Sequence, residues 1–260
     1  MTLTMSLLIG FAAGLHAAMY GAYKDSPHES FLMRRAIREL AVALTITMTL
    51  SVLHFSDGQS PFIVYLTTFA LARIITEFWK LFVRIEPQEG YRIPTQIHYI
   101  RGVVHNPAIR ILMGSGWIAG IYGLWALCTL IPAATPAPVR GMIVGLVIGA
   151  AEALCGAYKD GCMEGFYWHK FAKSPIFGAL GGLIASGHTT NLAFLLLATV
   201  GSMRMLLELL FKIVVPEYVP GKFRSMIGPF PHWTANRWRF LPPYVATWAF
   251  YLVLATHPTW

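Results

Sequence analysis

The chain has 260 residues, of which 56% are hydrophobic and 12% are charged, and its mean hydropathy is +0.56. This composition excludes an ordinary soluble globular domain and indicates a polytopic membrane protein. The formal charge of +8 is spread over loops beside apolar stretches, so it favours contact with anionic lipid headgroups and not with nucleic acid.

Eight apolar stretches approach the roughly 20 residues that a helix needs to cross a bilayer. In chain order they cover about 2–23, 38–55, 61–84, 111–132, 139–158, 175–188, 191–215 and 242–257. The first lacks a basic start and a cleavage site, so it is interpreted as a retained helix. The sixth is short and rich in glycine, which leaves a re-entrant segment open beside a full crossing.

Lysine and arginine concentrate in the loops after the first, third, fifth and seventh stretches, while the other three loops contain Arg140 alone. The positive-inside rule places the basic loops on the cytoplasmic or matrix side and both termini on the opposite side. The connections 85–110 and 216–241, rich in proline and aromatic residues, are predicted to be interfacial segments.

The chain contains an internal repeat. GFAAGLHAAMYGAYKD (10–25) matches GLVIGAAEALCGAYKD (145–160) at an offset of 135, and Arg73 and Glu77 match Arg204 and Glu208 at an offset of 131. We therefore predict an all-α membrane protein of two four-helix repeats, 1–135 and 136–260. Because each repeat has an even number of crossings, the copies are parallel and related by a pseudo-twofold axis along the membrane normal.

The repeated glycines Gly10 and Gly14, with Gly145 and Gly149, form small faces on the first and fifth helices. Such spacing lets helix backbones approach closely in lipid. We predict that these glycines pack helices together.

The repeated acids Asp25 and Glu29, with Asp160 and Glu164, end the same two helices, and Pro27 is expected to break the first. One hypothesis assigns them to Mg²⁺ on a lipid diphosphate, with phosphate contacts from Lys24, Lys159, Arg35, Lys170, Arg73 and Arg204. The acids lack the dense D-x-x-D runs usual for such sites. The structural alternative is that they end two similar helices at the headgroups.

Charges inside a crossing indicate function by default. Arg73 and Glu77, like Arg204 and Glu208, stand one turn apart on one helix, so each cation has an acid at hand. A packing role for these pairs is favoured over a lining for a transport path.

Few other residues indicate a cofactor. Haem would need an axial histidine such as His16, with His54 or His188 as a second ligand, whereas isolated membrane histidines more often bond a neighbouring helix. Cys128, Cys155 and Cys162 form neither a CxxC pair nor an even set, so no zinc or disulfide framework is expected. No phosphate-binding, dinucleotide-binding or metalloprotease motif occurs.

Two segments, GFAAGLHAAMYGAYKDSPHESFLMRR and LARIITEFWKLFV, resemble the opening and the later part of a unit in the peroxisomal members of the Tim-type translocase superfamily. Each four-helix half resembles one such unit. The resemblance implies a glycine-packed unit that lines a translocase or serves as an accessory subunit of a respiratory complex. Only Gly10, Gly14, Gly145 and Gly149 carry over, as packing residues.

The favoured hypothesis is a non-catalytic integral subunit of a larger membrane complex in the mitochondrial inner membrane, in contact with other subunits and anionic lipids. One alternative is a Mg²⁺-dependent lipid-diphosphate or nucleotide-lipid transferase, in which Asp25, Glu29, Asp160 and Glu164 would be catalytic. The other is a transporter or channel lined by Arg73, Glu77, Arg204 and Glu208. Mg²⁺ is expected only for the transferase.

Overall fold

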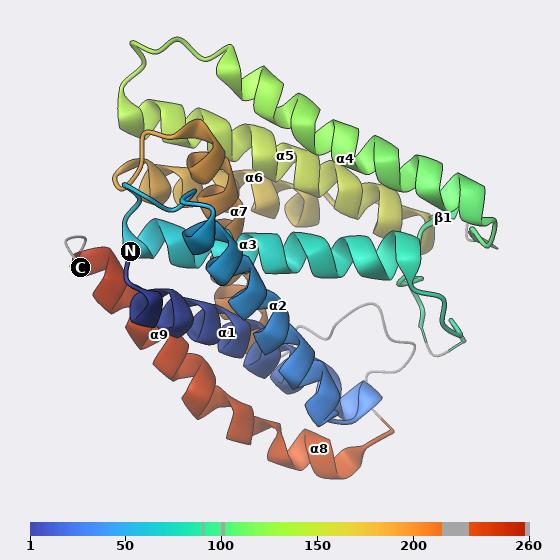
Figure 1. Cartoon of the computed structure of the whole chain (residues 1–260). Coiled ribbons are helices and arrows are strands. Elements are labelled where there is room, and N and C mark those ends of the chain that lie inside the picture. The colour runs from blue at the N-terminus through green and yellow to red at the C-terminus, as the bar shows by residue number, and fades with distance from the viewer. Residues whose placement is uncertain (90, 100–101, 215–228, 258–260) are drawn as a thin grey trace.

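The computed structural model describes residues 1–89, 91–99, 102–214 and 229–257, which form a bundle of helices (Figure 1). The helices are α1 (Leu3–Glu29), α2 (Met33–Val52), α3 (Pro61–Phe78), α4 (Pro107–Thr129), α5 (Ala137–Glu164), α6 (Trp168–Ser186), α7 (Leu192–Glu208), α8 (Pro231–Asn236) and α9 (Leu241–Thr256). Two π-helical segments, Trp79–Val83 and Leu209–Val214, extend α3 and α7, and the 3-10 turn Arg237–Phe240 leads into α9. The strands β1 (His98–Tyr99) and β2 (Gly102–Val103) pair antiparallel, with His98 opposite Val103.

Five helices in the described part are long and apolar enough to span a membrane: Leu3–Glu29, Pro61–Val83, Pro107–Thr129, Ala137–Gly161 and Leu192–Phe211. The protein therefore has the all-α fold of an integral membrane protein. α2 begins with a charged stretch, MRRAIRE, and α9 has only 16 residues. The eight crossings and the two repeats stay predictions.

The boundaries differ from expectation at three helix ends. α1 runs through Pro27 to Glu29, so the expected break at Pro27 is wrong. A proline so close to a helix end removes few helical hydrogen bonds, and the helix closes with the Ser30 N–H donating to the Ser26 carbonyl. α5 extends to Glu164, and α6 is one continuous helix of 19 residues that begins before Pro175.

The predicted glycines pack neighbouring helices. A Cβ added to Gly14 would lie 2.7 Å from the Leu40 Cα, and one added to Gly10 would lie 3.0 Å from the Leu44 Cα, so α1 packs closely on α2. Gly145 and Gly149 approach the backbone of α6 more closely, at Gly178 and at Ser174 and Pro175. The absence of side chains lets the backbones approach, as helix association in lipid favours.

α3 and α7 form the centre of the bundle. Residues 62–66 of α3 are completely buried, and a Cβ on Gly201 of α7 would collide with the Leu66 carbonyl, so the two backbones touch there. α1 and α5 lie on opposite sides of α3, α4 forms one edge, and the start of α1 and the end of α9 lie at the same end of the bundle (Figure 1). Polar residues on α3 and α7 must therefore be satisfied by neighbouring helices.

Candidate functional site

The repeated acids tie two helix corners. Arg35 near the start of α2 pairs with Glu29 at the end of α1, and Lys170 near the start of α6 pairs with Glu164 at the end of α5, where Nζ and Oε2 are 2.6 Å apart. Glu29 also accepts a hydrogen bond from the Tyr91 hydroxyl, at 3.1 Å. Both cations stand 135 residues apart, as do both acids.

The backbone of the two corners is alike as well. α1 and α5 end at Ser30 and Gly165, whose φ values of 64° and 82° lie in the left-handed region. α2 and α6 begin after Leu32 and Tyr167, both extended. Corresponding residues therefore form the same turn, and the corner ion pair fastens it.

A charge cluster surrounds Lys170. Its ammonium lies 3.1 Å from the Asp160 carboxylate in addition to Glu164. Partial burial of Lys170 lowers its pKa, but the bond to Glu164 and the charge of Asp160 outweigh this and raise the pKa above the usual value. Burial and the nearby Lys170 lower the pKa of Lys173.

The first corner holds Lys24 and Asp25, whose Nζ and Oδ1 are 3.6 Å apart, and the Lys24 ammonium lies 5.2 Å from the Tyr20 ring centroid. Lys159 occupies the corresponding place on α5 and is partly exposed. Within the residues that the structure describes, no three His, Cys, Asp or Glu side chains gather as a metal ion would require. The corner acids of α1 and α5 thus do not form a common carboxylate cluster.

The intramembrane arginines pair between helices and not along their own helix as expected. Arg73 of α3 lies 3.7 Å from Glu208 of α7, and Arg204 of α7 lies 3.1 Å from Glu152 of α5. Glu77 instead contacts Lys80, at 3.0 Å. Because an arginine side chain spans the gap between packed helices, the closer acid on a neighbour takes precedence over one a turn away.

Glu208 also faces His16, the most buried polar group of α1. His16 Nε2 lies 3.8 Å from Glu208 Oε2, and His16 Nδ1 lies 2.9 Å from the Thr247 hydroxyl of α9. We call His16, Arg73, Glu208 and Thr247 the His16 centre. It joins α1, α3, α7 and α9 at one point, which the sequence did not indicate because His16 has no counterpart in the second repeat.

Aromatic rings enclose the His16 centre. The His16 ring centroid lies 4.9 Å from that of Phe69, 4.7 Å from Tyr244 and 6.0 Å from Trp248. Within the described part of the chain, His16 Nε2 and Glu208 Oε2 are buried without a hydrogen-bond partner. Two polar atoms in this state are costly in an apolar interior, so the centre is a candidate functional site.

Sequence reasoning also missed Arg110, which it placed among basic loop residues. Arg110 is buried in the first turn of α4 and donates to the carbonyls of Phe82, Arg84 and Val104, at 2.9, 2.6 and 3.3 Å, and to the Gln96 side chain at 3.3 Å. It holds the connection 84–106 against the end of α3. Arginine in a segment rich in proline and lacking helical hydrogen bonds is the one signal that pointed to such a role.

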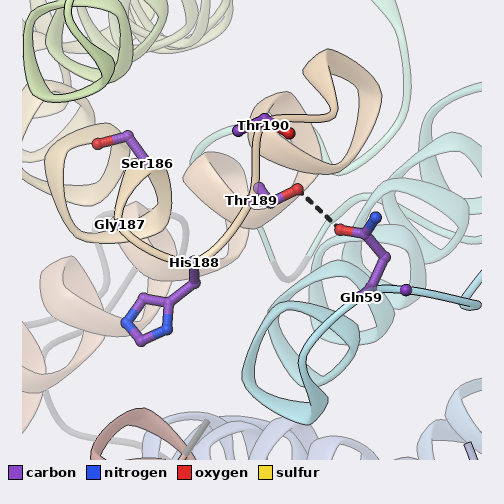
Figure 2. Close-up of a pocket in the computed structure, with 7 residues that line it drawn as sticks. Gln59, Ser186, Gly187, His188, Thr189 and Thr190 are labelled. Atoms are coloured by element: carbon purple, nitrogen blue, oxygen red, sulfur yellow. Dashed lines mark hydrogen bonds between the residues drawn. The ribbon is translucent and has the colours of Figure 1, made fainter. Parts of the chain in front are cut away.

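A polar hollow lies between the α2–α3 and α6–α7 loops (Figure 2). The Thr189 hydroxyl donates to the Gln59 side chain at 2.7 Å, while the His188 imidazole points away from that bond and packs 4.5 Å from the Phe62 ring centroid. Burial lowers the pKa of His188. The polar groups diverge, so the hollow is a weaker candidate than the His16 centre.

The other haem-ligand candidates occupy unrelated surroundings. His54 is exposed at the end of α2 and pairs with Asp57, with Nδ1 and Oδ2 2.9 Å apart. His16 is engaged by Thr247 and faces Glu208. The three histidines share no printed partner, so the geometry offers no haem-ligand pair.

Comparison with known proteins adds no family to this description: no protein-family model, no curated protein and no solved structure matches the chain.

Proposed function

We propose that this protein is a non-catalytic integral subunit of a larger membrane complex, which it scaffolds through α4. The observation that carries the proposal is the condition of that helix. Only 11% of its apolar window is buried within the chain, against 61% for α3 and 56% for α7.

α4 also presents an open small-residue face. A Cβ added to Gly116, Gly120 or Gly123 would meet no atom within 4 Å. These glycines are spaced by four and three residues, so they share one side of the helix. Glycines with the same spacing on α1 and α5 are covered by neighbouring helices, and such a face favours a transmembrane helix of a partner subunit.

The remaining features of the proposal rest on the sequence. We propose two parallel four-helix repeats, 1–135 and 136–260, and membership of the Tim-type translocase superfamily. The matching corners at Glu29 and Glu164 support the repeat. A mitochondrial inner membrane, basic loops on the matrix side, contact with anionic lipids and partners in a respiratory or translocase complex follow from that proposal.

The test is the native size of the complex in mild detergent and the product of a photo-crosslinker at position 120. Wild type is expected to migrate well above 28.9 kDa and to form one crosslink to a distinct membrane protein. Gly120→Leu is expected to release the chain from that partner. Gly21→Leu is the matched control, because a Cβ at Gly21 also meets no atom within 4 Å.

Three outcomes would contradict the proposal. One is a lone monodisperse chain in every mild detergent, and another is a crosslink between two copies of this chain. The third is turnover of a lipid substrate by the purified chain.

A transporter is a second candidate, favoured by the buried ionisable groups of the His16 centre. Substrate flux in liposomes that survives Asp25→Ala and fails in Glu208→Gln would select it. The Mg²⁺-dependent transferase has less support, because Arg35 and Lys170 already engage Glu29 and Glu164. Mg²⁺-dependent binding of a polyprenyl diphosphate, lost in Asp160→Ala, would restore it.

A further inference from the structure

The His16 centre has a chemical problem that its geometry states clearly. His16 is completely buried, and its two ring nitrogens face different neighbours, Thr247 on one side and Glu208 on the other. The protonation state of each nitrogen follows from the hydrogen bonds around it.

Thr247 determines the state of Nδ1. Its hydroxyl oxygen lies 2.6 Å from the Tyr244 carbonyl oxygen, a distance at which a proton must lie between the two atoms. A threonine hydroxyl has a single proton, which is therefore donated to Tyr244. Thr247 can only accept from His16, so Nδ1 carries the hydrogen of the 2.9 Å contact.

Nε2 of a neutral His16 is then a bare acceptor. It faces Glu208 Oε2 at 3.8 Å, and an ionised carboxylate is also only an acceptor. Two buried acceptors that face each other repel, and each would lack a hydrogen bond. One added proton removes the conflict, because an imidazolium Nε2–H donates to the carboxylate.

We propose that His16 Nε2 and Glu208 Oε2 form a reversible proton-binding site inside the bundle. Uptake converts the imidazole and one proton from water into an imidazolium paired with Glu208, and release reverses this. The inference does not depend on the partner face of α4.

Opposing forces make the site reversible. Glu208 favours the bound proton, while burial and the Arg73 guanidinium, 3.7 Å from Glu208 Oε1, oppose it. The other titratable groups near the centre are phenols of three helices and charges at its margin: Tyr20, Tyr65, Tyr244, Lys24, Glu39 and Glu77. Arg73, with 17% of its side chain exposed, is the most exposed member and connects the site toward the surface.

The bound proton would also control packing. His16, Glu208 and Thr247 belong to α1, α7 and α9, so release of the proton weakens the contact by which α1 holds α7. Water is expected to enter between Nε2 and Oε2 in that state, since the two acceptors need a shared donor.

The test is ¹⁵N NMR of histidine-labelled full-length protein in lipid nanodiscs from pH 5 to 9, with His16 assigned by its absence in His16→Asn. We expect His16 to change between an imidazolium at low pH and an Nδ1–H imidazole at high pH. Glu208→Gln should lower the midpoint by about 1–3 pH units, and Arg73→Gln should raise it.

Thr247→Val provides a second variant of nearly unchanged shape. Without its acceptor, the neutral imidazole is expected to carry its proton on Nε2 and donate to Glu208 at high pH. Thr256→Val is the matched control on α9, because Thr256 bonds only carbonyls of its own helix. A neutral wild-type His16 with its proton on Nε2, or a His16 that keeps one protonation state from pH 5 to 9, would overturn the proposal.

Discussion

Arg73 and Arg204 stand 131 residues apart on α3 and α7, yet their surroundings differ. Arg73 meets a Glu208 that is almost fully buried and shared with His16, whereas the side chain of Arg204 is 37% exposed beside Glu152. The acids that pair with them come from unrelated positions. A repeated residue therefore keeps its type but takes its role from the helices that cover it.

The largest expected effect separates these two arginines. Glu208→Ala should destabilise the protein by about 3–5 kcal/mol, because Arg73 is left in an interior without a counter-charge. Thermal unfolding in detergent measures the loss.

Glu152→Ala is the matched variant and should cost about 1 kcal/mol or less, since the partly exposed Arg204 can extend toward the headgroups. Equal losses in the two variants would remove the distinction between the arginines.

The glycine faces give the next effect. Gly145→Ala should destabilise by about 1–3 kcal/mol, because the added methyl group collides with the α6 backbone at Gly178, which cannot rotate away. Gly10→Ala should cost less, since the Thr47 side chain, 2.9 Å away, can turn.

Gly156→Ala is the control for both, because its Cβ meets open space and alanine is the better helix former. It should leave the melting temperature unchanged or raise it. A loss in Gly156→Ala equal to that in Gly145→Ala would show that helix propensity, and not close packing, explains the glycines.

The two long connections form a further comparison. Arg110 anchors the first, while the position 131 residues later is Leu241. Arg110→Lys should cost about 1–2 kcal/mol, because an ammonium cannot replace the guanidinium bonds to three carbonyls and Gln96.

Limited proteolysis within 84–106 should accelerate in Arg110→Lys and not in Arg92→Lys, where the side chain is exposed. Unchanged cleavage in both variants would argue against an anchoring role.

The smallest effect concerns the second corner. The pKa of Lys170 is raised in the folded protein, so its contribution to stability is complete below the unfolded value of about 10.4 and is lost as pH rises through the folded value. Wild type should therefore lose more stability between pH 10 and 11 than Lys170→Met, by about 1 kcal/mol or less.

Thermal melts at both pH values measure the difference. Arg35→Met is the matched variant at the first corner, where an arginine does not titrate in this range, so its loss should not depend on pH.

Part of the fold and of the site was predictable. The apolar stretches indicated α3, α5 and α7, and the glycine spacing indicated close packing at Gly14 and Gly149. Pairing of Arg73 and Arg204 was expected along each helix and occurs across helices. His16 was considered only as a haem ligand, because nothing in its own segment announces Glu208, which lies 192 residues later.

The sequence by itself determined what depends on neighbours along the chain: the membrane class, most helix positions, and the small faces on α1 and α5. Hydrophobicity and helical spacing act over a few turns, so they can be read locally. Only the tertiary structure decided which acid meets each arginine, what Arg110 holds, and that His16 faces Glu208. Those contacts arise from helix packing, which brings together residues that no local pattern relates.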